Sequence, residues 1–192
     1  SSSSAFSLNG VLPACAAPNN YGAGLAGTGG IVPHLTFSGG TTRDGNSVLR
    51  LLHYPPTPSN PDGVRAEAHE DINTITLLLG AEEAGLQLLT KSGDWLSIDP
   101  PKGAMVINVG DMLQRLTNHR LPSTTHRVIN PPPERRHIPR YSMPFFLHLA
   151  SDFEIKTLPG CIDAAHPDLY PVPITADEYL QQRLVEIGLR QA

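Results

Sequence analysis

Short apolar runs, each about the length of a strand, recur along the chain from residue 43 onward. Turn-forming residues separate them, as in Lys91-Ser92-Gly93-Asp94 and Pro100-Pro101-Lys102-Gly103. Runs of this length, punctuated by Gly, Pro, Asn and Asp, are typical of strands, and their spacing favours antiparallel sheets over alternating strands and helices. We therefore predict a mainly β fold, a double-stranded β-helix (jelly roll). The predicted strands cover residues 48–54, 74–79, 86–90, 95–98, 105–109, 126–129 and 141–149.

Two segments show helical patterns instead. Thr175 and Glu178 stand at capping-box spacing, and apolar residues recur every three or four positions from Leu180 to Ile187. This pattern predicts a C-terminal helix. A short connecting helix is expected over residues 112–116, with the Asp111 carboxylate as its cap.

The first 42 residues differ in texture from the rest. They contain no Lys, Arg, Asp or Glu and are dominated by small and polar residues, a composition that cannot bury enough apolar surface to fold alone. The segment also lacks an initiator Met and a basic leader, which favours a truncated or atypical N-terminus over a targeting signal. We therefore expect a low-complexity, loop-rich segment over residues 1–42 and one jelly-roll domain over residues 43–192.

Charge and composition limit the classes of binding partner that we expect. The formal net charge of -4 is spread along the 192 residues, without the basic stripe that nucleic acid or an acidic membrane would attract. No apolar run approaches the roughly 18 residues of a membrane-spanning helix. We therefore expect a small-molecule partner, no nucleic acid and no membrane. The two cysteines form no disulfide framework, which makes the cytoplasm the default location. The oligomeric state cannot be predicted from these features.

Candidate chemistry begins at His69-Glu70-Asp71. Residues two apart on an extended strand point to the same face, so one imidazole and one carboxylate can reach a single ion. A third ligand has to come from elsewhere, and His126 opens a later strand that could lie across the barrel. Two histidines and one carboxylate leave coordination positions open, as non-haem iron(II) sites do to bind a cosubstrate and dioxygen. Zinc uses similar ligands, so this pair alone is a weak signal.

A cationic residue downstream strengthens the pattern. Arg140-Tyr141-Ser142 precedes the most apolar run in the chain, and period two places Arg140 and Ser142 on one face of a strand. A guanidinium beside a hydroxyl can grip a carboxylate through bidentate, charge-assisted hydrogen bonds, as a dicarboxylate cosubstrate requires. A surface arginine at the start of a strand is the alternative, because Arg is mostly exposed.

Together these residues resemble the His-x-Asp, distant His and Arg-x-Ser motif of the 2-oxoglutarate and iron(II)-dependent dioxygenases, in the branch that includes isopenicillin N synthase. The resemblance runs from about residue 46 to residue 189. Four further segments follow the family's order, namely Gly85-Leu86-Gln87, Asn108-Val109-Gly110-Asp111, Thr117-Asn118 and Pro144-Phe145-Phe146. The combination is specific.

The resemblance implies a role for each motif residue. His69, Asp71 and His126 would hold iron(II). Arg140 and Ser142 would bind the distal carboxylate of 2-oxoglutarate. The implied reaction couples oxidative decarboxylation of 2-oxoglutarate by O2 to the hydroxylation, desaturation or ring closure of a small organic substrate.

The chain also departs from the family. The resemblance implies that Tyr54 gives its hydroxyl to the cosubstrate, but many plant members carry an asparagine two positions earlier, where this chain has Leu52. Members of the family normally have a long helical N-terminal region, where this chain has residues 1–42.

Two alternatives therefore remain open. One is an oxidase like isopenicillin N synthase that does not use 2-oxoglutarate, which Ile75-Thr76 after His69-Glu70-Asp71 resembles equally well. The other is a non-catalytic jelly-roll fragment that lacks the N-terminal substrate region.

Overall fold

The computed structural model describes residues 6–9, 34–37, 39–79, 83–101 and 103–191. Most of the segment expected to be low in complexity therefore lies outside the described residues. Within it, β1 (Phe6–Asn9) and β2 (His34–Phe37) form an antiparallel pair that the composition did not predict, and α1 (Gly39–Thr42) follows.

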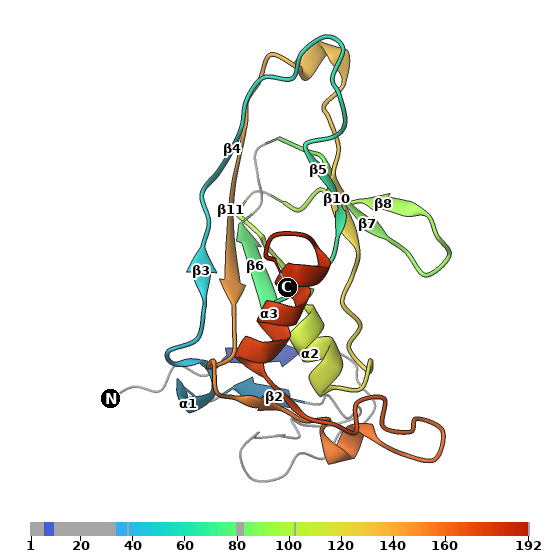
Figure 1. Cartoon of the computed structure of the whole chain (residues 1–192). Helices are drawn as coiled ribbons and strands as arrows, with labels where there is room; N and C mark the ends of the chain where they lie inside the picture. Colours follow the sequence, from blue (N-terminus) through green and yellow to red (C-terminus); the bar gives the residue numbers. More distant parts are fainter. Residues whose placement is uncertain (1–5, 10–33, 38, 80–82, 102, 192) are drawn as a thin grey trace.

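Two antiparallel sheets face each other and form the predicted jelly roll (Figure 1). One sheet has the strand order β5-β10-β7-β8, and the other has β3-β11-β6-β9, with β4 also paired to β11. The strands are β3 (Val48–Leu49), β4 (Leu52–Tyr54), β5 (Ala66–His69), β6 (Ile75–Leu79), β7 (Leu86–Leu89), β8 (Trp95–Ser97), β9 (Met105–Val109), β10 (His126–Val128) and β11 (Arg140–Leu147).

The longest strand, β11, shows how the alternation of side chains builds the interior. Arg140, Ser142 and Pro144 are buried, whereas Tyr141 and Met143 between them are exposed. The period-two argument that placed Arg140 and Ser142 on one face is thus confirmed, and that face is turned inward. The predicted strand over residues 48–54 is divided into β3 and β4, and both pieces pair with β11.

A hydrophobic cluster gathers around two helices, α2 (Asp111–Leu116) and α3 (Ala176–Glu186). Its buried members are Ile75, Met112, Leu113, Leu116, Leu149, Ile155, Leu158, Cys161 and Ala176. Between the helices the chain forms β12 (Glu154–Ile155), β13 (Ile174–Thr175) and short 3-10 turns at Pro133–Arg135 and Pro159–Cys161. The cluster therefore fixes the end of the sandwich from which α2 extends.

The C-terminal helix begins as predicted. The Thr175 hydroxyl accepts a hydrogen bond from the Glu178 backbone N–H (3.2 Å), and the Thr175 N–H donates to the Glu178 carboxylate (3.0 Å), which completes the capping box. Gly188, with φ +75°, follows the end of the helix.

The expected cap of α2 was wrong. Gly110 is the N-cap, and Asp111 is the first residue of the helix. A Cβ on Gly110 would lie 2.2 Å from the carbonyl oxygen of Asn73, so only glycine permits this close approach. The Asp111 side chain is buried, and its Oδ2 lies 3.2 Å from Nε of Arg183. Because the Asp111 N–H also donates to the Asp71 carbonyl (2.8 Å), the turn after β5 is tied to the start of α2.

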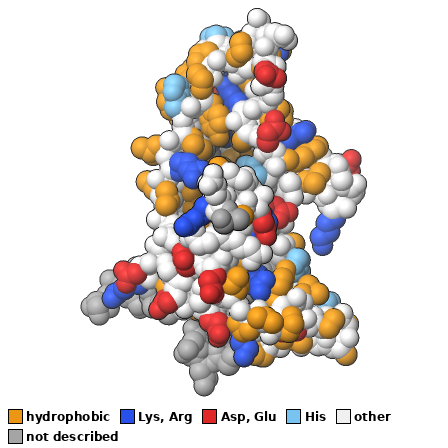
Figure 2. All heavy atoms as spheres, in the orientation of Figure 1, with side chains coloured by type: hydrophobic (Ala, Val, Ile, Leu, Met, Phe, Trp, Pro, Cys, Tyr) orange, Lys and Arg blue, Asp and Glu red, His pale blue; other side chains and the backbone are white. Residues whose placement is uncertain are grey.

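On the face shown in Figure 2, basic and acidic side chains of the described residues are interspersed, and no continuous basic stripe is visible there. Within the described part of the chain, no helix combines the length and the apolar character needed to cross a membrane.

Candidate metal centre and adjoining pocket

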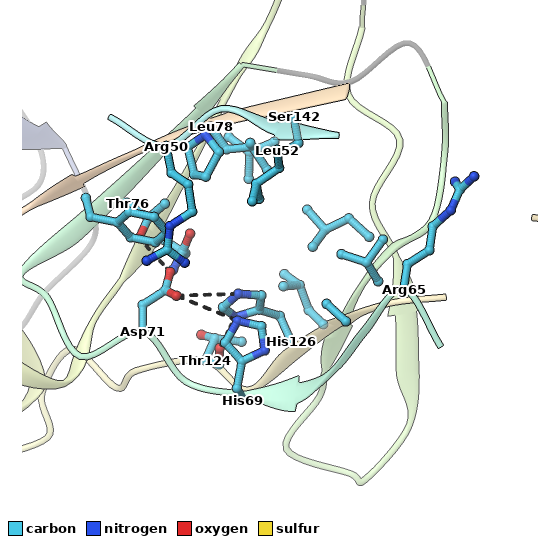
Figure 3. A pocket seen from close by; sticks show the side chains of 18 of the residues that line it. Arg50, Leu52, Arg65, His69, Asp71, Thr76, Leu78, Thr124, His126 and Ser142 are labelled. Atoms are coloured by element: carbon cyan, nitrogen blue, oxygen red, sulfur yellow. Dashed lines mark hydrogen bonds and ion pairs between the residues drawn. The ribbon is translucent and has the colours of Figure 1, made fainter. Parts of the chain in front are cut away.

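The structure brings His69, Asp71 and His126 together (Figure 3). Oδ1 of Asp71 lies 3.9 Å from Nε2 of His69 and 3.8 Å from Nε2 of His126. His69 ends β5, and Asp71 lies in the turn that follows. The sequence suggested that His126 could lie across the barrel from His69. It lies instead on the neighbouring strand β10, directly opposite His69 in the register. Two paired strand ends therefore build this cluster.

Each histidine is held by a backbone carbonyl. Nδ1 of His69 lies 2.7 Å from the Glu67 oxygen, and Nδ1 of His126 lies 3.0 Å from the Thr124 oxygen. A carbonyl can only accept a hydrogen bond, so each Nδ1 must carry the proton. The lone pair is then on Nε2, the atom turned toward Asp71. Hydrogen bonding of this kind sets the tautomer and orientation of metal-binding histidines.

The Asp71 carboxylate is buried and oriented by two donors. Its Oδ2 accepts hydrogen bonds from the Thr76 hydroxyl (2.5 Å) and from Nδ2 of Asn108 (2.8 Å), so Oδ1 alone faces the histidines. Asn73 in turn donates to the Thr76 hydroxyl (2.8 Å). Sequence reasoning gave no role to Thr76 or Asn108, although both stand in segments that carry the family resemblance. Such donors fix the direction in which a ligand carboxylate points.

A cavity of ≈ 550 Å³ opens beside the cluster, between the two sheets. This volume lies within the usual range of small-molecule pockets, about 300–1,000 Å³. Its walls come from alternate positions of the strands, for example Leu52 and Tyr54 of β4, Thr76 and Leu78 of β6, and His126 and Val128 of β10. His69 stands at the open side, because its side chain is 48% exposed while that of His126 is 13% exposed.

Arg140 lies on the wall of this cavity and is 3% exposed. Its Nε donates to the Glu83 carbonyl (3.1 Å), whereas its buried Nη1 has no partner among the described residues. Burial lowers the pKa of Arg140 from its ordinary value, but a guanidinium stays protonated in proteins. A buried charge with an unused donor is costly, and a bound carboxylate would satisfy it.

The other two predicted cosubstrate residues lie beside Arg140. Tyr54 is opposite Arg140 in the register of β4 and β11, with its ring centroid 5.4 Å from the guanidinium carbon. Ser142 is buried two positions along β11 and lines the same cavity. Leu52, the departure from the family pattern, pairs with Ser142 and presents an apolar side chain to the cavity.

The donor set fits the groups that the resemblance implies. Two imidazole nitrogens and one carboxylate oxygen lie within 4.8 Å of one another and leave further coordination positions open, as a catalytic iron requires. The unpartnered Nη1 of Arg140 in the same cavity is a free donor of the kind that a carboxylate of 2-oxoglutarate would require.

A second arginine on the cavity wall is engaged elsewhere. Nη2 of Arg65 donates to the Ile138 carbonyl (3.2 Å), two residues before Arg140. The Glu83 carboxylate accepts hydrogen bonds from both Nε (3.1 Å) and Nη2 (2.5 Å) of Arg135. The segment that leads into β11 is therefore held by contacts at both Arg135 and Ile138, which fixes the position of the Arg140 backbone.

Comparison with known proteins agrees with this geometry. The sequence profile of the 2OG-Fe(II) oxygenase superfamily matches residues 45–149. The chain is 41% identical over 146 residues to the 2-oxoglutarate-Fe(II) type oxidoreductase hxnY of Emericella nidulans, a match that covers 73% of this chain and 40% of that protein. It is 35% identical over 135 residues to gibberellin 3-beta-dioxygenase 2 of Arabidopsis thaliana, covering 70% of this chain and 37% of that protein.

Solved structures give the same result. A crystal structure described as a 2OG-Fe(II) oxygenase family protein from Caulobacter crescentus superposes with a TM-score of 0.73 at 69% identity, over 78% of this chain and 48% of that chain. A full-length Neurospora crassa protein, crystallised in complex with alpha-KG, gives a TM-score of 0.69 at 35% identity, over 77% of this chain and 47% of that chain. The chain spans about two fifths of the length of the curated relatives it matches. It belongs to the 2OG-Fe(II) oxygenase superfamily.

Proposed function

We propose that this chain supplies the oxygenase domain of an enzyme that binds iron(II) and 2-oxoglutarate and uses O2 to oxidise a small organic substrate, by hydroxylation, desaturation or ring closure. One observation carries the proposal. The buried guanidinium of Arg140 has an unused donor, Nη1, and lines the same cavity as His69, Asp71 and His126.

In this proposal the metal is held through Nε2 of each histidine and Oδ1 of Asp71. Iron supplies the redox chemistry of oxygen activation when it is bound. The protein supplies orientation: the hydrogen bonds of each Nδ1 to the carbonyls of Glu67 and Thr124 turn both Nε2 atoms toward the metal position. Thr76 and Asn108 keep Oδ1 turned toward them.

Arg140, Ser142 and Tyr54 bind the distal carboxylate of the cosubstrate. The guanidinium supplies charge, and the two hydroxyls can donate a hydrogen bond each. Leu52 offers no such bond, so the binding energy rests more heavily on Arg140 than in relatives with an amide there. Leu52 and the other apolar wall residues exclude water from the reacting centre, which strengthens each charge interaction within it.

The experiment measures 2-oxoglutarate binding without O2, in protein loaded with iron(II). We expect the weak visible charge-transfer band of the chelate in the wild type and a fall of roughly 10–100-fold in affinity for 2-oxoglutarate in Arg140→Gln, because hydrogen bonds to charged groups contribute about 1.5–3 kcal/mol. Iron affinity should stay unchanged. Arg43→Gln, at an exposed arginine outside the cavity, serves as the matched control.

Each alternative predicts a different result. Stoichiometric iron binding with no affinity for 2-oxoglutarate would contradict the cosubstrate assignment and favour an oxidase like isopenicillin N synthase. Failure to bind iron at all would favour a non-catalytic fragment. A His126→Ala variant that binds iron with full affinity would remove the third ligand from the proposal.

A further inference from the structure

Arg50 lies between β3 and β4, on the wall of the cavity beside the metal cluster. Its backbone N–H donates to the Pro144 carbonyl (3.0 Å), and its guanidinium carbon lies 5.1 Å from the centroid of the Phe146 ring. Figure 3 shows the guanidinium turned into the pocket on the side of Asp71, away from Ser142. The backbone bond and the aromatic ring hold a cation at this place, since arginine stacks well on aromatic faces.

The guanidinium of Arg50 has no hydrogen-bond or ion-pair partner within the described ranges of the chain. The other two arginines of the cavity wall each donate to a backbone carbonyl, Arg65 to that of Ile138 and Arg140 to that of Glu83. Nε and Nη1 of Arg65 and Nη1 of Arg140 are buried without a partner among the described residues. Asp71 lies on the same side, but its Oδ2 accepts from Thr76 and Asn108, and its Oδ1 faces the histidines. No carboxylate of the cavity wall is therefore available to Arg50.

A count of formal charges shows that this cation remains unbalanced in the loaded site. Among the described residues that line the cavity, Arg50, Arg65, Asp71 and Arg140 carry formal charges at neutral pH. Asp71 and one carboxylate of 2-oxoglutarate balance the two positive charges of iron(II), and Arg140 balances the other carboxylate. Arg50 and Arg65 are left uncompensated, and of the two only Arg50 has its guanidinium on the side of Asp71 (Figure 3). An unpaired cation on the wall of a largely apolar cavity attracts anions.

We propose that Arg50 determines specificity by binding the carboxylate of the primary substrate, and that the substrate is a small organic monoacid. This inference rests on the proposed function. The apolar part of the substrate would contact Phe146 and the neighbouring aliphatic side chains, which places its C–H bonds near the metal. The exposed position of Arg50 leaves it open to a ligand that enters from solvent.

The test uses protein loaded with Zn(II), which is redox-inert, and saturated with 2-oxoglutarate, so that Arg140 is already occupied. Calorimetry measures the affinities of three acids and of their neutral amides: phenylacetate, 3-phenylpropionate and cyclohexylacetate. We expect the acids to bind at least about tenfold more tightly than the amides, as the loss of a charge-assisted hydrogen bond implies. Arg50→Gln should abolish this preference, and Arg50→Lys should restore part of it. Arg43→Gln is the matched control.

The outcomes separate this inference from the proposed function. Equal affinity for every acid and its amide in the wild type, absence of acid binding, or a preference that survives in Arg50→Gln would each overturn the role of Arg50. Loss of 2-oxoglutarate binding in Arg50→Gln would overturn it too, because Arg50 would then be a cosubstrate residue. A wild type that fails to bind 2-oxoglutarate would instead contradict the proposed function. Circular dichroism and the melting temperature establish that each variant is folded.

Discussion

Replacement of Thr76 by valine tests whether the hydrogen bonds around Asp71 control metal binding. The hydroxyl of Thr76, which is 3% exposed, donates to Oδ2 of Asp71 at 2.5 Å, and valine has nearly the same shape without the donor. A hydrogen bond to a charged group contributes about 1.5–3 kcal/mol, which corresponds to roughly 10–100-fold in affinity. Because Asn108 still donates to the same oxygen, we expect the lower end, a loss of about tenfold in metal affinity.

The same substitution leaves the amide of Asn73 without its acceptor. Asn73 is 1% exposed, so the metal-free protein should also lose about 1–3 kcal/mol of unfolding free energy. Competition with a chromophoric chelator measures the metal affinity, and urea unfolding measures the stability. Thr76→Ser, which keeps the hydroxyl, is the control and should resemble the wild type. A folded Thr76→Val protein with wild-type metal affinity, or a serine variant as impaired as the valine variant, would refute the reasoning.

Two further predictions concern the support of the site. Burial raises the pKa of Asp111, so the folded protein binds a proton on this carboxylate more tightly than the unfolded chain does. The free energy that this proton contributes to folding is fully present below the unfolded pKa, about 3.9, and is lost as the pH rises through the pKa of the folded protein. Asp111→Asn should therefore gain stability relative to the wild type between about pH 4 and 7 in urea unfolding, and a flat or opposite difference would contradict this. Thr175→Ala removes the capping box of α3 and should cost about 1 kcal/mol in the same assay, against a few tenths for Thr175→Ser; equal losses would show that the hydroxyl is not the stabilising group.

Most strands of the jelly roll were predictable because each has its own local pattern, whereas β5 lies outside the predicted runs. The run over residues 105–109 forms a strand with the expected bounds, and the Arg140-Tyr141-Ser142 alternation correctly predicted which side chains point inward. The capping box at Thr175 is equally local. Period, turn residues and caps are properties of neighbouring positions, so a single sequence contains them in full.

Pairings between distant segments could not be predicted in the same way. The position of His126 next to His69 depends on which strands pair and in what register, and neither strand encodes its partner. The cap of α2 was wrong for a related reason: Gly110 is required there by the Asn73 backbone, which is packed against it from another part of the chain. That Arg50 has no partner in the described part of the chain likewise depends on every side chain around the cavity.

The register of β5 has a consequence for how the chain moves. Among the described strands, β5 is an edge strand that pairs with β10 alone, through two register pairs with an irregularity between them. Edge segments with so few backbone bonds open locally at low cost. A metal ion held by both strands would stabilise the pairing of β5 with β10. At a free metal concentration of a hundred times its dissociation constant, the paired state gains about 2.7 kcal/mol of free energy over the locally opened state. Amide hydrogen exchange in β5 should therefore slow on metal loading. His69 is the most exposed of the three proposed ligands and should be the last to bind the ion.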